Sequence, residues 1–185
     1  MLESLRRSLG MGAARWHFRS SREKVISFSH SISTSDRVLV VMPLQPAAEE
    51  GQTSVLTFLR EHFYEPDITV IAPAGGTPVE RALPRCRVIL LGPEDLNALF
   101  LPRRTFLARV AERSYDLAID LNLDFMIPSA YICRESNARV RTGFSAGNAD
   151  TFFNFQVRLE PAARAGHAYD RLVRCLQMFF SGEEV

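Results

Sequence analysis

The chain has 185 residues, 46% of them hydrophobic, and its formal net charge is +1. This length allows one domain with a proper hydrophobic core, and the near-zero charge gives no case for binding nucleic acid. No apolar run approaches the roughly 18 residues that a membrane-spanning helix needs, and the N-terminus lacks the apolar stretch of a secretion signal.

The cysteines and histidines predict neither a metal site nor a cofactor. Three cysteines, Cys86, Cys133 and Cys175, are too widely spaced for a zinc pattern, and the four histidines show no metal-ligand spacing. We therefore expect reduced thiols and a cytoplasmic protein, with the inner face of the cytoplasmic membrane as the alternative location.

The first 35 residues are predicted to form a basic arm outside the main domain, which we assign to residues 36–182. Leucines indicate one face of a short helix that Gly10 and Gly12 interrupt. We expect the arm to contact a partner protein, and the candidate residues are Arg6, Arg7, Arg15, Trp16, Arg19 and Arg22. Two alternatives stay open: a solvated arm packed loosely on the domain, and an anchor in a membrane interface, where basic and aromatic residues also mix.

The first strand of the domain is predicted at Val38–Met42, a continuous apolar run typical of a strand buried on both faces. Pro43 and Pro46 exclude an immediate helix, and apolar residues at helical spacing resume at positions 55–59. Ligands of open α/β sheets bind at the carboxyl ends of strands, so we expect a ligand crevice in the intervening loop. Its candidate residues are Pro43, Leu44, Gln45 and Gly51.

Later apolar runs predict five more strands, over residues 67–72, 87–91, 115–121, 138–144 and 152–159. Between and after them, residues 96–110 have the apolar spacing of one or two helices, with Pro102 near a helix start. Residues 127–134 and 166–180 each have the apolar spacing of one helix. Strands that alternate with helices predict a single Rossmann-like, doubly wound α/β domain with a mostly parallel sheet.

Charged residues flank two of these strands. Asp116 and Asp120 share one strand face, and Asp120 lies at the carboxyl end, so it joins the predicted crevice together with Asn122. The alternative role for Asp120 is to order the following loop. Arg139 and Arg141 also share a strand face, and they indicate either a solvated sheet edge or a site for a phosphate or lipid core group.

Four segments in this order resemble a known family. The first is Val38–Met42 with the helix ending at Arg60, and the second is YDLAIDLN at Tyr115–Asn122, similar to the family's YDLVIDLQ. The third is ARVRTGF at Ala138–Phe144, similar to its ARRRIGF, and the fourth is HAYDR at His167–Arg171, similar to the helix that links its two domains. From Arg37 to Phe180 the chain thus resembles the N-terminal half of the ADP-heptose:lipopolysaccharide heptosyltransferases of glycosyltransferase family 9.

The resemblance implies half of a two-domain GT-B enzyme, the half that faces the acceptor sugar, while a C-terminal domain holds the nucleotide sugar. This chain ends after the interdomain helix, so we expect the donor half to be absent. The family has a Gly-Asp pair in this loop, and its aspartate is the presumed general base. In an alignment without gaps the pair falls on Ala47 and Ala48, which cannot take a proton. Glu49 and Glu50 are the nearby carboxylates, and they are either a shifted base or loop acids that favour the next helix N-terminus.

Three functions remain open on these grounds. The leading hypothesis is a non-catalytic heptosyltransferase-like domain that acts as a binding or scaffold subunit of a protein assembly. The alternative is the acceptor-binding half of a glycosyltransferase that works with a separate donor-domain chain. The third is a domain that binds a small ligand in the crevice between Pro43 and Gly51.

Overall fold

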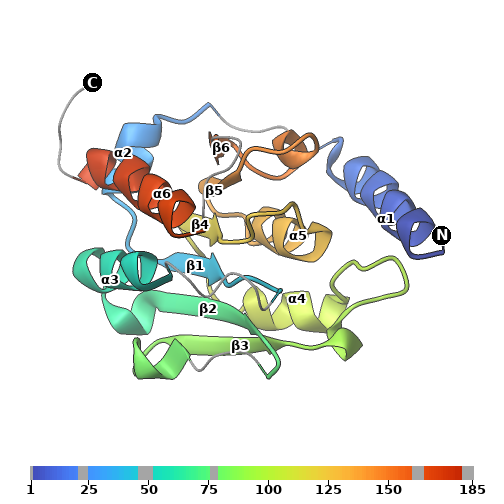
Figure 1. Ribbon diagram of the computed structural model, residues 1–185, viewed down its shortest axis with the longest axis horizontal. Coiled ribbons are helices and arrows are strands. Elements are labelled where there is room, and N and C mark those ends of the chain that lie inside the picture. Colours follow the sequence, from blue (N-terminus) through green and yellow to red (C-terminus); the bar gives the residue numbers. More distant parts are fainter. Residues whose placement is uncertain (1, 21–24, 46–51, 76–78, 160–164, 181–185) are drawn as a thin grey trace.

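A single six-stranded parallel sheet forms the centre of the molecule, with strands in the order β3-β2-β1-β4-β5-β6 (Figure 1). The computed structural model describes residues 2–20, 25–45, 52–75, 79–159 and 165–180. The strands are β1 (Val38–Val41), β2 (Ile68–Pro73), β3 (Arg87–Leu91), β4 (Leu117–Asp120), β5 (Val140–Phe144) and β6 (Phe155–Val157), and every neighbouring pair runs parallel. The predicted parallel α/β sheet is therefore confirmed.

Helices cover both faces of this sheet. They are α1 (Leu2–Phe18), α2 (Phe28–Ser33), α3 (Gln52–His62), α4 (Arg104–Val110), α5 (Ile127–Glu135) and α6 (Ala165–Phe180), with short 3₁₀ turns at Glu65–Asp67, Val79–Arg81, Pro93–Asp95 and Ala149–Thr151. Val38 and Val40 point into the core shared with α3 and α6, whereas Leu39 and Val41 point into the core shared with α4 and α5. Successive strand residues face opposite sides, which explains why the first apolar run is continuous.

Of the one or two helices predicted over residues 96–110, one α-helix forms, and it begins at Arg104, close to the predicted helix start at Pro102. Before it, the side-chain oxygen of Asn97 accepts hydrogen bonds from the backbone nitrogens of Leu99 and Leu101, at 2.8 and 3.1 Å. Phe100 has a left-handed φ of 59°. The Asn97 side chain therefore offers this segment an alternative to helical hydrogen bonds, and a compact loop results.

The predicted interruption of the first helix at Gly10 and Gly12 is wrong, since α1 continues through both. Gly10 faces the domain, where an added Cβ would collide with the carbonyl oxygen of Leu99, while Gly12 has open space around it. Close packing at Gly10 thus offsets the poor helix propensity of glycine. Within the same N-terminal region, residues 28–33 form α2, and its Ile32 is fully buried in the core beside α6.

The predicted solvated edge is wrong for Arg141, because β6 pairs with the outer side of β5. Arg141 is buried and donates to the carbonyl oxygens of Phe152 (3.0 Å) and Ala138 (2.8 Å). Arg139 precedes the strand, is exposed, and pairs with the Asp116 carboxylate at 3.0 Å. The two guanidinium groups have separate structural partners and do not form a joint phosphate site.

Candidate ligand-binding site

The switch point of the sheet lies between β1 and β4. From β1 the chain winds outward through β2 and β3, and from β4 it winds the other way through β5 and β6. The loops that leave the carboxyl ends of β1 and β4 therefore diverge, and ligands of open α/β sheets bind in the crevice that this creates.

Asn122 joins the two loops at this point. Its side-chain nitrogen donates to Oδ1 of Asp120 at 2.6 Å and to the carbonyl oxygen of Met42 at 3.4 Å. Its side-chain oxygen accepts from the backbone nitrogen of Leu44 at 2.8 Å. Asp120 and Asn122, both predicted as crevice residues, are buried beneath the loops, an arrangement that fits the alternative loop-ordering role.

Asp120 sits in a low-dielectric environment. Burial raises the pKa of its carboxyl group from 3.8 to about 6, although hydrogen bonds from Ser129 and Asn122 act in the opposite direction. Burial, with the nearby charge of Asp120, also raises the pKa of the Cys133 thiol and of the Tyr169 hydroxyl. A carboxyl group with a raised pKa is typical of functional sites, but this one lies behind the loops rather than on a cavity wall.

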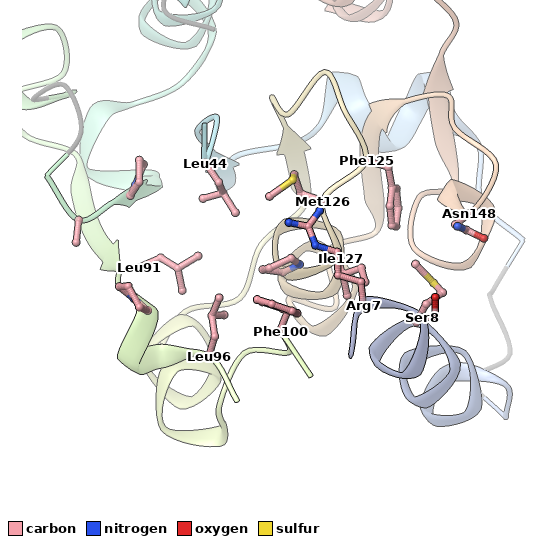
Figure 2. Close-up of a pocket in the computed structure, with 16 residues that line it drawn as sticks. Arg7, Ser8, Leu44, Leu91, Leu96, Phe100, Phe125, Met126, Ile127 and Asn148 are labelled. Carbon is pink, nitrogen blue, oxygen red and sulfur yellow. The ribbon is translucent and has the colours of Figure 1, made fainter. Parts of the chain in front are cut away.

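A cavity of about 700 Å³ opens above these loops (Figure 2). Residues at or after the carboxyl ends of β1, β2, β3 and β4 line it, including Leu44, Pro73, Leu91 and Met126. Arg7, Ser8 and Met11 of α1 line it as well, so helix α1 forms part of the wall. The cavity therefore lies at the switch point and includes part of the N-terminal region.

Among the described residues, the cavity wall is mainly apolar, and Arg7 is its charged member. In Figure 2, Arg7 lies between Met126, Ile127 and Phe100, near the middle of the site. Its guanidinium carbon is 5.6 Å from the Phe100 ring centroid, and a nitrogen pairs with Glu3 at 2.7 Å. Ser8 and Asn148 add polar atoms. This wall suits a ligand with an apolar body and one anionic or polar group.

Helix α1 is held in place by the basic residues that the sequence assigned to a partner. Arg6 donates to the carbonyl oxygen of Ala98 at 2.6 Å, and Arg15 donates to the side-chain oxygen of Asn148 at 2.6 Å. His17 pairs with Glu135 at 2.7 Å, and the Phe18 ring packs on Tyr131. The arginines are thus engaged within the chain, whereas Trp16 is exposed with Arg19 over its ring.

The remaining predicted residues have different positions. Leu44 lines the cavity, Pro43 is buried, and Gln45 is exposed beside the Met126 sulfur. Gly51, Glu49, Glu50 and Arg22 lie outside the described residues. Sequence reasoning missed Phe100 and the 125–128 segment as cavity residues, although the latter follows a strand end and could have been found by that signal.

Metal ligands are not gathered anywhere in the described ranges, where no group of three His, Cys, Asp or Glu side chains could hold an ion. Cys86, Cys133 and Cys175 all lie in the described part of the chain, and none of them is in a disulfide. Each helix in the described part of the chain falls short of the length and apolar character that crossing a bilayer requires.

The sheet order and the cavity at the switch point define a Rossmann-like α/β domain of the kind that forms half of a GT-B glycosyltransferase. Among solved structures, the chain is similar to a glycosyltransferase family 9 protein from Veillonella parvula DSM 2008, with a TM-score of 0.52 and 18% identity. The match covers 78% of this chain and 41% of that one. At this identity the likeness shows a glycosyltransferase-like fold alone. No family model matches the sequence, and none of the curated proteins does.

Proposed function

We propose that this glycosyltransferase-like domain acts by binding a small ligand in the carboxyl-edge cavity and does not itself transfer a sugar. The observation that carries the proposal is the chemistry of the cavity wall. It offers a large apolar surface and the Arg7 guanidinium, and the described lining residues include no carboxylate or imidazole. The ligand in this proposal has an apolar body and one anionic group that Arg7 meets.

The absence of a base from the described wall supports binding over transfer. A general base must lie within hydrogen-bond reach of the hydroxyl whose proton it takes. Asp120 does not meet this condition, because it is buried behind the loop and accepts hydrogen bonds from the side chain and backbone of Asn122. Ala47 and Ala48, which take the place of the family's presumed base in the resemblance, have no proton-accepting side chain.

Titration with 8-anilinonaphthalene-1-sulfonate tests the binding proposal, since this dye has an aromatic body and one sulfonate. Ala74→Trp places a large side chain in the cavity, and Ala111→Trp places the same side chain on an exposed helix end outside it. We expect Ala74→Trp to weaken dye binding by roughly tenfold, or 1.4 kcal/mol, and Ala111→Trp to leave it unchanged. Equal affinities for the two variants would contradict the proposal.

Arg7→Met tests the charged part of the site, because methionine keeps an apolar stem without the guanidinium. The expected result is weaker binding of the sulfonate dye and unchanged binding of the uncharged analogue N-phenyl-1-naphthylamine. A parallel loss for both dyes would mean that the substitution disturbs the wall and that Arg7 does not select the anion.

A second candidate is the acceptor-binding half of a glycosyltransferase that acts with a separate donor-domain chain. Its support is the likeness to a family 9 fold, together with the sequence position of Glu49 and Glu50, which follow the cavity residue Leu44 by a few positions and lie outside the described residues. It predicts sugar transfer from a nucleotide donor when the donor-domain chain is added. Transfer that disappears in Glu49→Gln or Glu50→Gln would replace the non-catalytic proposal.

A further inference from the structure

Helix α1 has two apolar faces, and only one of them is covered by the domain. Gly10, Ala14 and Phe18 are buried on the inner face. The outer face carries four large apolar side chains at helical spacing that are exposed to solvent: Leu2 (78%), Leu5 (57%), Leu9 (55%) and Trp16 (69%). At 100° per residue these four lie along one line of the helix, opposite the buried face. We call them the outer stripe.

Cationic side chains flank the outer stripe on both sides. Arg6 bonds a backbone carbonyl, Arg15 bonds a side-chain amide, and Arg19 lies over the Trp16 ring. None of these three pairs with a carboxylate in the described part of the chain, so no described carboxylate offsets their positive charges. Arg7 differs from them, because it lies on the cavity side and pairs with Glu3.

We propose that the outer stripe docks α1 on an anionic phospholipid surface, with the helix axis parallel to the membrane plane. Leucine and tryptophan side chains would enter the interface while the flanking arginines remain at the level of the headgroups. Helix α1 lies at the rim of the molecule, outside α5, so a flat surface can approach it (Figure 1). This inference does not depend on the proposed ligand, although it would bring the cavity on the inner face of α1 close to the membrane.

Charge favours this occupant over a second copy of the chain. Pairing two outer stripes would bring the flanking arginines Arg6, Arg15 and Arg19 of both copies together, and like charges in close contact are unfavourable. An anionic bilayer instead attracts each basic residue near its surface. Trp16 also favours the membrane, because tryptophan is enriched at the boundary between headgroups and acyl chains.

Flotation of the full chain with phospholipid vesicles tests the proposal. We expect binding to vesicles of phosphatidylcholine with about 30 mol% phosphatidylglycerol, and at least roughly fivefold less binding to pure phosphatidylcholine or at about 500 mM salt. Trp16 is the only tryptophan of the chain, so its emission should shift to shorter wavelength when the anionic vesicles bind.

Leu5→Ser/Leu9→Ser removes the centre of the outer stripe without touching the inner face, and Arg19→Gln removes one charge without touching the leucines. Both variants should float less than the wild type, whereas Leu90→Ser on β3, a leucine exposed to 52%, should float equally. Circular dichroism checks that each variant is folded.

Wild-type flotation no greater than that of Leu5→Ser/Leu9→Ser would overturn the proposal. If the wild type is a dimer, the variant is a monomer, and both float equally, the outer stripe binds a second copy of the chain and not a membrane.

Discussion

The side-chain nitrogen of Asn122 lies 2.6 Å from Oδ1 of Asp120, and both side chains are buried at the carboxyl end of β4. Through its oxygen, the same Asn122 side chain holds the backbone nitrogen of Leu44, the cavity residue that follows β1. The position of this cavity residue therefore depends on a polar contact that is itself covered from solvent. Buried polar groups of this kind are costly to leave unsatisfied.

Asn122→Ala should lower the free energy of unfolding by about 2–4 kcal/mol, because it leaves the Leu44 nitrogen and the Asp120 carboxylate without this partner. Urea denaturation followed by circular dichroism measures the change. Gln45→Ala, an exposed position in the same loop, is the control and should cost no more than about 0.5 kcal/mol. Similar costs for both variants would mean that Asn122 does not stabilise the loop.

Asp120 should make the protein less stable as pH rises. Its pKa is about 6 in the folded protein and 3.8 ordinarily, so the folded state binds the proton more tightly. The resulting stabilisation is present in full below about pH 4 and is lost as pH rises through 6. The difference between the two pKa values corresponds to about 3 kcal/mol in the free energy of unfolding. Asp120→Asn cannot titrate, so the stability difference between variant and wild type should change over this pH range and then stay constant. A difference that is independent of pH would refute the raised pKa.

Gly10 and Gly12 form a matched pair on α1. Gly10→Ala should displace the helix, since the new Cβ would meet the Leu99 carbonyl oxygen, whereas Gly12→Ala has open space and should stabilise the helix by about 0.5–1 kcal/mol. Hydrogen exchange of the α1 amides reports both effects. We expect faster exchange in Gly10→Ala and slower exchange in Gly12→Ala, and the same direction in both would show that packing at Leu99 is not required.

Arg141 and Arg139 form a second pair, of which one is buried and one exposed. Arg141→Met should lower the free energy of unfolding by about 2–4 kcal/mol, because the carbonyl oxygens of Phe152 and Ala138 lose their donor. Arg139→Met removes a solvent-exposed ion pair with Asp116 and should cost no more than about 1 kcal/mol. Thermal unfolding of the two variants measures this ranking, and equal midpoints would contradict it.

The strands were the most predictable part of the fold. Val38–Val41 and Leu117–Asp120 are buried on both faces, so their apolar character is visible residue by residue in the sequence. Their alternation with helices was enough to predict a doubly wound parallel sheet. The crevice after the first strand followed from the same topology, and Leu44 does line a cavity there.

The cavity as a whole could not be predicted, because residues distant in the sequence form it. Arg6 and Ala98 are 92 positions apart, yet their hydrogen bond helps to place α1 over the strand ends. In the sequence, an arginine that binds a partner cannot be distinguished from one that binds its own domain. The position of α1 shows that Arg7 lines the cavity and Arg15 bonds Asn148, whereas Arg19 lies over the exposed Trp16 ring. Arg141 is a similar case, since its burial depends on the later strand β6.

The sequence by itself determined the local elements and the class of fold, because the spacing of apolar residues along a strand or helix indicates which of its faces is buried. The tertiary structure alone decided that α1 forms part of the cavity wall, that Asn122 joins two loops, and that four large apolar side chains remain on the surface of α1. These features arise from contacts between distant segments, and such contacts have no periodic signal along the chain.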